Sequence, residues 1–89
     1  MTIFPSINME ATGLKIKSLR EKNGYTVRGL QKELGFATAQ AIYKWQQGVT
    51  LPSIDNLVAL SHLFHVRIED LLVCSTPAVI TPFSDRSAA

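Results

Sequence analysis

The chain is poor in cysteine, in charge and in long apolar runs. The chain has 89 residues and a single cysteine, Cys74. One cysteine excludes an internal disulfide and a cysteine zinc cluster, and is compatible with a reducing cytosol. No apolar run approaches the roughly 20 residues that span a bilayer. The opening segment, residues 1–5, lacks the charged region of a signal peptide. We therefore expect a soluble, cytoplasmic protein that makes no membrane contact.

Enzyme signatures are also lacking. There is no glycine loop for phosphate, no recognisable carboxylate pair and no arrangement of cysteine and histidine for nucleophilic catalysis. His62 and His65 have no cysteine or carboxylate at a recognised ligand spacing, so we interpret them as surface residues. The sequence predicts neither an enzyme nor a metal site nor a cofactor.

The positive charge is concentrated in the first half of the chain. A length of 89 residues with 46% hydrophobic content indicates one small domain, and its net charge of +2 is too small to imply a partner. Between positions 15 and 44, however, basic residues outnumber acidic ones by seven to two. A polyanion would meet this half, but lysine-rich helix surfaces also serve solubility, and charge alone does not decide between the two.

Two helices are predicted before position 36. Asn8 is placed to cap a helix that runs to about Asn23, with Ile16 and Leu19 facing the core. Thr26 can cap the next helix, which has an apolar face formed by Val27, Leu30 and Leu34 and ends at Gly35. Within it, Gly29 costs about 1 kcal/mol relative to alanine, so we expect it to allow close approach of a neighbouring helix.

A short helix over residues 39–47 is where we expect function. At 100° per residue, Ala41, Ile42 and Trp45 point inward. The outward side chains are two amides, a phenol and an ammonium, all able to hydrogen-bond with bases or phosphates. They belong to Gln40, Tyr43, Lys44 and Gln47. Since no carboxylate lies among them, the pattern is typical of a helix that enters the major groove of DNA.

Two more helices are predicted to complete the core. Ser53 caps the fourth, which runs through about Phe64 and is expected to be the main buried wall. Its expected inner side consists of Ile54, Leu57, Val58, Ser61 and Phe64. The fifth covers Ile68 to Leu72 and is expected to bury Ile68, Leu71 and Leu72. The last residues, 74–89, contain two prolines and predict a frayed tail; the alternative is an extended arm over Ala78 to Phe83.

Several short motifs follow one another at a specific spacing. They are the run 16–20, the run 24–26, Leu30, the pair 34–35, Ile42, Trp45, Gly48, the run 52–57 and Leu71. In this order they resemble the Cro and phage-repressor (XRE-type) helix-turn-helix family over roughly residues 12–73. The resemblance implies an all-α fold, a compact five-helix lambda-repressor-like DNA-binding domain. It divides the chain into a lead-in over 1–7, the helix-turn-helix domain over 8–73 and the tail over 74–89.

The resemblance also implies roles for individual residues. The helix around Ala39 to Gln47 would enter the major groove while the preceding helix crosses the DNA backbone. Base-reading positions would be occupied by Thr38, Ala39, Gln40, Tyr43 and Lys44. Gln40 suits a bidentate contact to adenine, and Lys44 suits guanine O6 and N7. Phosphate-contacting positions would be occupied by Lys17, Thr26, Val27, Gln47 and Thr50, and Arg28 is added on charge alone.

Three positions depart from the family pattern. The stretch from Gly35 to Ile42 is one residue longer than usual, which predicts a modified turn over Phe36 to Ala39. Val27 stands where glutamine is common, so backbone amides would replace a side-chain contact to phosphate. Gln46 stands where a glutamate often pairs with the arginine at Arg20, and we expect an Arg20–Gln46 hydrogen bond instead.

Two functions of different classes are consistent with these patterns. The first is a sequence-specific regulator of transcription, a bacterial or phage repressor, that binds double-stranded DNA as a homodimer in the cytoplasm, at the nucleoid. Pairing two half-sites raises both affinity and specificity. The alternative is a protein-interaction module such as an antitoxin, whose partner is a toxin. Helix five and the tail are the expected dimer surfaces.

Overall fold

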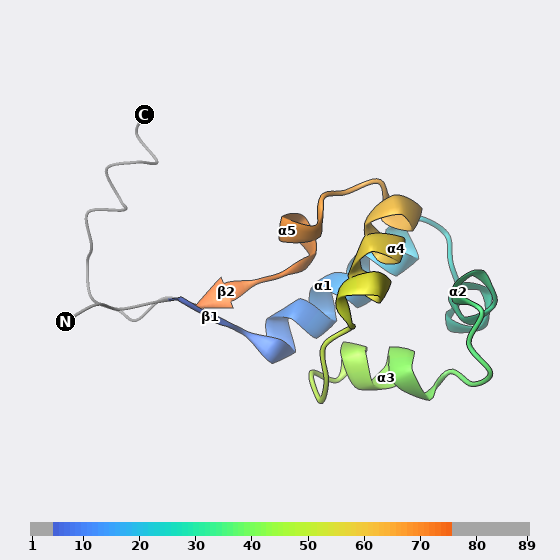
Figure 1. Cartoon of the computed structure of the whole chain (residues 1–89), viewed down its shortest axis with the longest axis horizontal. Helices are drawn as coiled ribbons and strands as arrows, with labels where there is room; N and C mark the ends of the chain where they lie inside the picture. Colours follow the sequence, from blue (N-terminus) through green and yellow to red (C-terminus); the bar gives the residue numbers. More distant parts are fainter. Residues whose placement is uncertain (1–4, 76–89) are drawn as a thin grey trace.

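The computed structural model describes residues 5–75. Five helices make up most of it and confirm the predicted all-α, lambda-repressor-like architecture (Figure 1). They are α1 (Met9–Lys22), α2 (Val27–Leu34), α3 (Gln40–Gln46), α4 (Ile54–Phe64) and α5 (Ile68–Leu71). Two short strands, β1 (Ser6–Ile7) and β2 (Cys74–Ser75), join the two ends of the described chain.

The predicted N-terminal caps of α1, α2 and α4 are confirmed by their hydrogen bonds. The side chain of Asn8 accepts from the amide of Ala11 at the start of α1. Thr26 Oγ1 accepts from the amide of Gly29 at 2.9 Å and so caps α2. The Ser53 hydroxyl caps α4 in the same way. Because each cap satisfies a helix amide that has no partner within the helix, the local sequence alone determines where these helices begin.

All five helices contribute to one apolar core. Its buried members are Ile16, Leu19, Leu30, Ile42, Trp45, Leu57, Leu60, Phe64 and Leu71. Of the predicted inward residues of α5, Leu71 is fully buried, whereas Ile68 and Leu72 are half-buried against this core. Burial of an aliphatic side chain contributes about 1.5–3 kcal/mol, so this cluster holds the short helices together.

The inner face of α4 differs from the prediction. Ile54 and Val58 were expected inside, but they are 74% and 43% exposed. Leu60, which is fully buried, lines the core instead, between Leu57 and Phe64. At 100° per residue these three lie within about 60° of one another, and Val58 lies about 100° away from Leu57. Ser61 was also expected on the inner face, but it is only half-buried.

α1 and α3 pack closely because of a glycine in α1. A Cβ on Gly13 would lie 2.3 Å from the carbonyl oxygen of Trp45, which is closer than side-chain atoms tolerate. This crossing sets the position of α3 against the body. The prediction that Gly29 allows such an approach was wrong. The nearest atom to a Cβ at Gly29 would be the Thr26 hydroxyl of its own helix cap, at 3.2 Å.

A two-stranded ribbon extends the helical body at one end. β1 and β2 pair antiparallel, with Ser6 opposite Ser75 and Ile7 opposite Cys74. Two contacts with Val73 anchor the ribbon, since the amide of Asn8 donates to the Val73 carbonyl and the Val73 amide donates to Thr12 Oγ1. These strands lie in the lead-in and the tail, and they were not predicted from the sequence. The arm proposed for Ala78 to Phe83 lies outside the described residues.

Candidate nucleic-acid interface

α3 is fixed to the body by its apolar side. Ile42 is fully buried and Trp45 is 4% exposed, as the sequence predicted. Phe36, in the turn before α3, meets the Trp45 ring edge-on, with 5.7 Å between ring centroids and 70° between planes. An edge-to-face pair of this kind adds to the area that it buries. The turn and the helix are therefore held by one aromatic contact, which sequence periodicity gave no means of finding.

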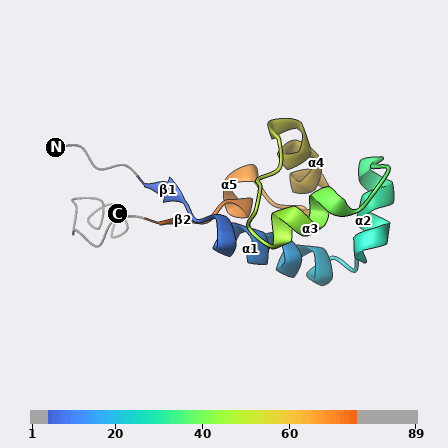
Figure 2. The same cartoon turned by 90° about the horizontal axis from the view of Figure 1, so that it is seen from below.

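The outer side of α3 is polar and uncovered. Gln40, Lys44 and Gln47 are exposed, and the Tyr43 side chain is 49% exposed. α3 contains no carboxylate. It lies along the lower edge of the molecule in Figure 1, and it faces the viewer in Figure 2 with no helix in front of it. The four outward side chains predicted from the sequence thus share one accessible face.

The start of α3 has an unusual, weakly capped geometry. Residues 36–39 form an irregular segment between α2 and α3, where the modified turn was predicted. Ala39 is the N-cap and offers no side-chain hydrogen bond, while Thr38 Oγ1 accepts from the amide of Gln40 at 3.4 Å. Thr38 is exposed and Ala39 is half-buried. Of these two base-reading candidates, Thr38 has the more accessible side chain.

The N-terminus of α2 offers donors for an anion. Thr26 is exposed, and its oxygen accepts the Gly29 amide, which leaves the hydroxyl proton free to donate outward. Arg28 is exposed as well. The Val27 side chain, by contrast, is half-buried against the core, so only the backbone of this candidate is available to phosphate. The positive end of a helix favours an anion here.

The remaining phosphate candidates flank α3. Lys17 is exposed on α1. In the sequence it lies between Gly13 and Arg20, both of which contact α3. At 100° per residue it is within about 60° of them around the helix. Gln47 and Thr50 are exposed at the end of α3 and in the loop that follows it. The predicted phosphate contacts therefore come from α1, from the cap and first turn of α2, and from the residues that follow α3.

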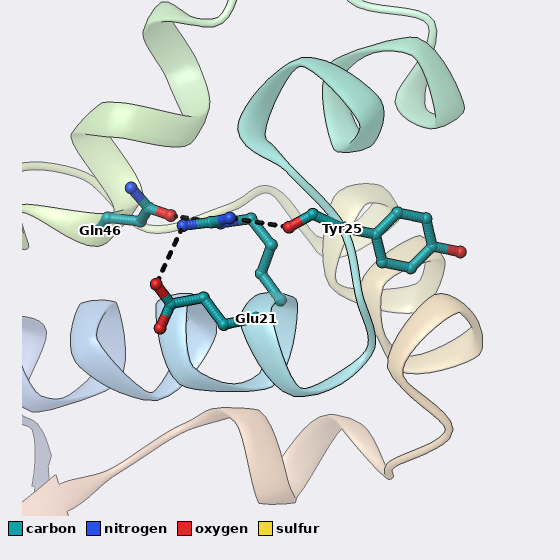
Figure 3. A network of polar contacts seen from close by, with 4 residues as sticks. Glu21, Tyr25 and Gln46 are labelled. Carbon is teal, nitrogen blue, oxygen red and sulfur yellow. Dashed lines mark hydrogen bonds and ion pairs between the residues drawn. The ribbon is translucent and has the colours of Figure 1, made fainter.

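One buried arginine links the three helices of this surface. Arg20 Nε donates to Gln46 Oε1 at 2.9 Å, which confirms the hydrogen bond expected from the sequence (Figure 3). Arg20 Nη1 donates to the carbonyl oxygen of Tyr25 at 2.8 Å. A third nitrogen lies 3.9 Å from a Glu21 carboxylate oxygen. Arg20 thus connects α1 with the segment before α2 and with the end of α3.

A shallow hollow lies elsewhere, between the end of α4 and the start of α5. It is open to solvent, has a volume of about 440 Å³ and is lined by Ser61, His62, His65, Val66, Arg67 and Asp70. None of these residues belongs to α2 or α3. Among residues 5–75, no group of three or more histidine, cysteine or acidic side chains is arranged to hold a metal ion.

The fold and the exposed polar face of α3 define a helix-turn-helix domain. In agreement with this, the sequence model of the helix-turn-helix family matches residues 16–71. The chain belongs to this family, and the resemblance to the Cro and phage-repressor (XRE-type) proteins is confirmed. Family membership makes the chain a DNA-binding regulator. No curated protein matches the chain in sequence.

Solved structures show the same fold at low sequence identity. The restriction-modification controller protein C.AhdI from Aeromonas hydrophila is 17% identical and superposes with a TM-score of 0.63, over 72% of this chain and 96% of that one. The clp gene regulator ClgR from C. glutamicum is 20% identical, with a TM-score of 0.63 over 76% and 86%. The S. venezulae BldD DNA-binding domain is 18% identical, with a TM-score of 0.61 over 73% and 96%.

The described helices are all too short or too polar for a membrane span. Across residues 5–75, none combines the length and the apolar character that a crossing requires.

Proposed function

We propose that this chain is a sequence-specific repressor that reads double-stranded DNA through the major groove with α3. The observation that carries the proposal is the two-sided character of α3. Its inner side is fixed by Ile42 and Trp45, while its outer side is polar, free of carboxylates and uncovered. A major groove admits a helix of this kind, and its base edges offer the donors and acceptors that amide, phenol and ammonium groups can match.

Base reading is assigned to the first turns of α3. Gln40 is exposed at the first position of the helix, where its amide can bond to adenine N6 and N7. Lys44 follows four residues later on the same side, and its ammonium can donate to guanine O6 and N7. Tyr43, Thr38 and Ala39 lie beside them as further base neighbours. A rigid attachment through Trp45 fixes where these groups meet the bases.

Phosphate binding is assigned to the groups that surround α3. The Thr26 hydroxyl, the Val27 backbone amide and the Arg28 side chain offer donors at the positive end of α2. Lys17 lies near the side of α1 that faces α3, and Gln47 and Thr50 follow the end of α3. Contacts of this type carry no sequence information, but they set the register of the protein on the duplex.

We further propose that the chain acts as a homodimer. A single recognition helix reads only a few base pairs, whereas two copies on half-sites one helical turn apart raise affinity and specificity together. α5 and the chain after it are our proposed dimer surface. Sedimentation of the protein with and without an operator duplex tests this, because a dimer predicts two chains per bound duplex.

The first test is the salt dependence of binding to random duplex DNA. We expect measurable affinity that falls steeply as salt rises, because each neutralised phosphate releases a counterion and contributes about −0.9 to the slope of log K against log salt. The competing hypothesis, a module of the antitoxin type that binds a toxin, predicts absent or salt-insensitive binding to random duplexes. That result would contradict our proposal.

The second test separates base reading from phosphate binding. Gln40→Ala and Lys44→Ala should each reduce the preference for the selected site over random DNA by about 1–3 kcal/mol, the cost of a lost bidentate contact. Lys17→Ala should weaken binding to all duplexes alike and lower the salt slope by about 1.

Lys15→Ala is the matched control for Lys17→Ala. Both lysines are exposed on α1 and carry the same charge, but they lie about 160° apart around the helix. Of these two lysine variants, only Lys17→Ala should change the slope of log K against log salt. Equal behaviour of the Lys17, Gln40 and Lys44 variants in the selectivity assay would contradict the assigned roles.

A further inference from the structure

Within residues 5–75, the charge of Arg20 has no buried counter-ion. Its guanidinium is always protonated, and the residue is only 8% exposed. Its two short hydrogen bonds go to neutral groups, the Gln46 side-chain amide and the Tyr25 carbonyl (Figure 3). The Glu21 carboxylate, 3.9 Å away, has a side chain that is 59% exposed, so water screens this pair. A nearly full positive charge therefore remains inside the protein.

This charge lies directly behind the surface assigned to DNA. Tyr25 immediately precedes Thr26, the cap of α2, and Gln46 is the last residue of α3. The guanidinium is hydrogen-bonded to both, so it is placed between the positive end of α2 and the end of α3. A charge in a partly buried site is screened less than a solvated lysine, and its field reaches further toward an approaching phosphate.

We propose that neutral Gln46 keeps the Arg20 charge available to DNA. Arg20 is then a positioning residue that also attracts the phosphate backbone through space, without direct contact. A carboxylate at position 46 would form a partly buried ion pair with the guanidinium and cancel this field. The inference rests on the proposed function, and it assigns part of the sequence-independent affinity to a residue that touches no nucleotide.

The test is Gln46→Glu, assayed by urea unfolding and by binding to random duplexes over a salt series. The variant should resist urea at least as well as the wild type, because a charged acceptor strengthens the bond from Arg20. Its binding to every duplex should nevertheless be weaker, by roughly 3- to 10-fold at low salt, with the difference shrinking as salt screens the field. A purely structural role for Gln46 predicts unchanged or tighter binding.

Two further variants isolate the cause. Ser18→Glu adds the same charge on the exposed side of α1 that lies about 140° from Gly13, and should change binding by less than about 2-fold. Gln46→Met removes the amide but keeps the Arg20 charge. Once corrected for the folded fraction, it should bind random duplexes as the wild type does.

The outcomes separate this inference from the proposed function. If the wild type binds DNA and Gln46→Glu binds equally well, the inference is overturned. It is also overturned if Ser18→Glu loses as much affinity, or if Gln46→Met loses more than Gln46→Glu. If the wild type itself fails to bind duplexes at low salt, the proposed function fails instead. Should Gln46→Glu not fold, Arg20→Met is compared with Gln46→Met at equal folded fraction. Weaker binding of random duplexes by Arg20→Met supports the inference, and equal binding overturns it.

Discussion

α3 and α4 are both amphipathic helices, but their outer faces differ in kind. α3 has few apolar residues, and those that pack inward, Ile42 and Trp45, leave only polar groups outside. α4 is apolar over most of its circumference, so its outer face retains Ile54 and Val58. Neither face is covered by another element of residues 5–75, since both carry exposed side chains. The chemistry of the outer face, and not its accessibility, distinguishes the DNA-reading helix.

α3 and α4 also show when the spacing of apolar residues determines which side of a helix faces the core. In α3 only one orientation buries the apolar residues, so the inner face was predicted correctly. In α4 several orientations bury a comparable apolar area, and the choice depends on the shape of the surrounding core. Leu60 faces that core, and Ile54 and Val58 do not. Helix periodicity predicted α4 and placed Leu57 and Phe64 inside correctly, but it turned the inner face toward Ile54 and Val58 instead of Leu60.

The largest expected effect comes from the inner face of α4. Leu60→Ala should lower the free energy of unfolding by about 2–5 kcal/mol, because Leu60 is fully buried and its removal leaves a cavity. Ile54→Ala should change it by less than about 0.5 kcal/mol, since surface substitutions have small effects. Urea unfolding of both variants measures the difference. If Ile54→Ala were the more destabilising, the orientation of α4 would be wrong.

A smaller effect is expected where α1 crosses α3. Gly13→Ala should cost about 1–3 kcal/mol, because a methyl group would overlap the Trp45 carbonyl and push the two helices apart. Gly29→Ala is its control within a helix. It should change stability by less than about 1 kcal/mol, since the methyl meets only side-chain atoms, the Thr26 hydroxyl at 3.2 Å and a Tyr25 ring carbon at 4.0 Å, and the helix propensity improves.

The crossing also determines where α3 meets DNA. Gly13→Ala should therefore weaken sequence-specific binding even when the folded fraction is restored by lower temperature. Wild-type affinity in a folded Gly13→Ala protein would show that DNA docking tolerates displacement of α3.

The smallest effects on stability are expected from substitutions on the outer faces of α3 and α4, and their effects on DNA binding should differ. Tyr43 and Val58 have similar exposure, 49% and 43%, but Tyr43 lies on α3 and Val58 on α4. Tyr43→Ala and Val58→Ala should each change the free energy of unfolding by about 1 kcal/mol or less. Only Tyr43→Ala should weaken binding to the selected duplex, as measured by fluorescence anisotropy at fixed salt. A greater loss of binding with Val58→Ala would show that α3 is not the helix that binds DNA.

Features encoded by neighbouring residues could be predicted from the sequence. The caps at Asn8, Thr26 and Ser53 depend on side chains three residues or fewer from the amides that they satisfy. The Arg20–Gln46 bond is a long-range contact, and it was predicted because the family resemblance supplied the pairing. The exposed set on α3 followed from helix periodicity alone.

Other features required the three-dimensional packing. The ribbon pairs Ser6 with Ser75, and strands of two residues leave no recognisable alternation in a sequence. The close approach at Gly13 depends on where the Trp45 carbonyl lies, which no residue near Gly13 encodes. The contact of Phe36 with Trp45 likewise depends on the path of the turn before α3. The base and phosphate assignments stay predictions until DNA is added.

The most direct test of the α3 assignment is an NMR titration of the ¹⁵N-labelled chain with a duplex at low salt. We expect the largest amide shifts at Thr26 to Arg28 and at Ala39 to Lys44, where α2 and α3 would meet the duplex. Shifts centred on the hollow lined by His62, His65 and Arg67, with residues 39–44 unchanged, would contradict the assignment of α3 as the DNA-reading helix.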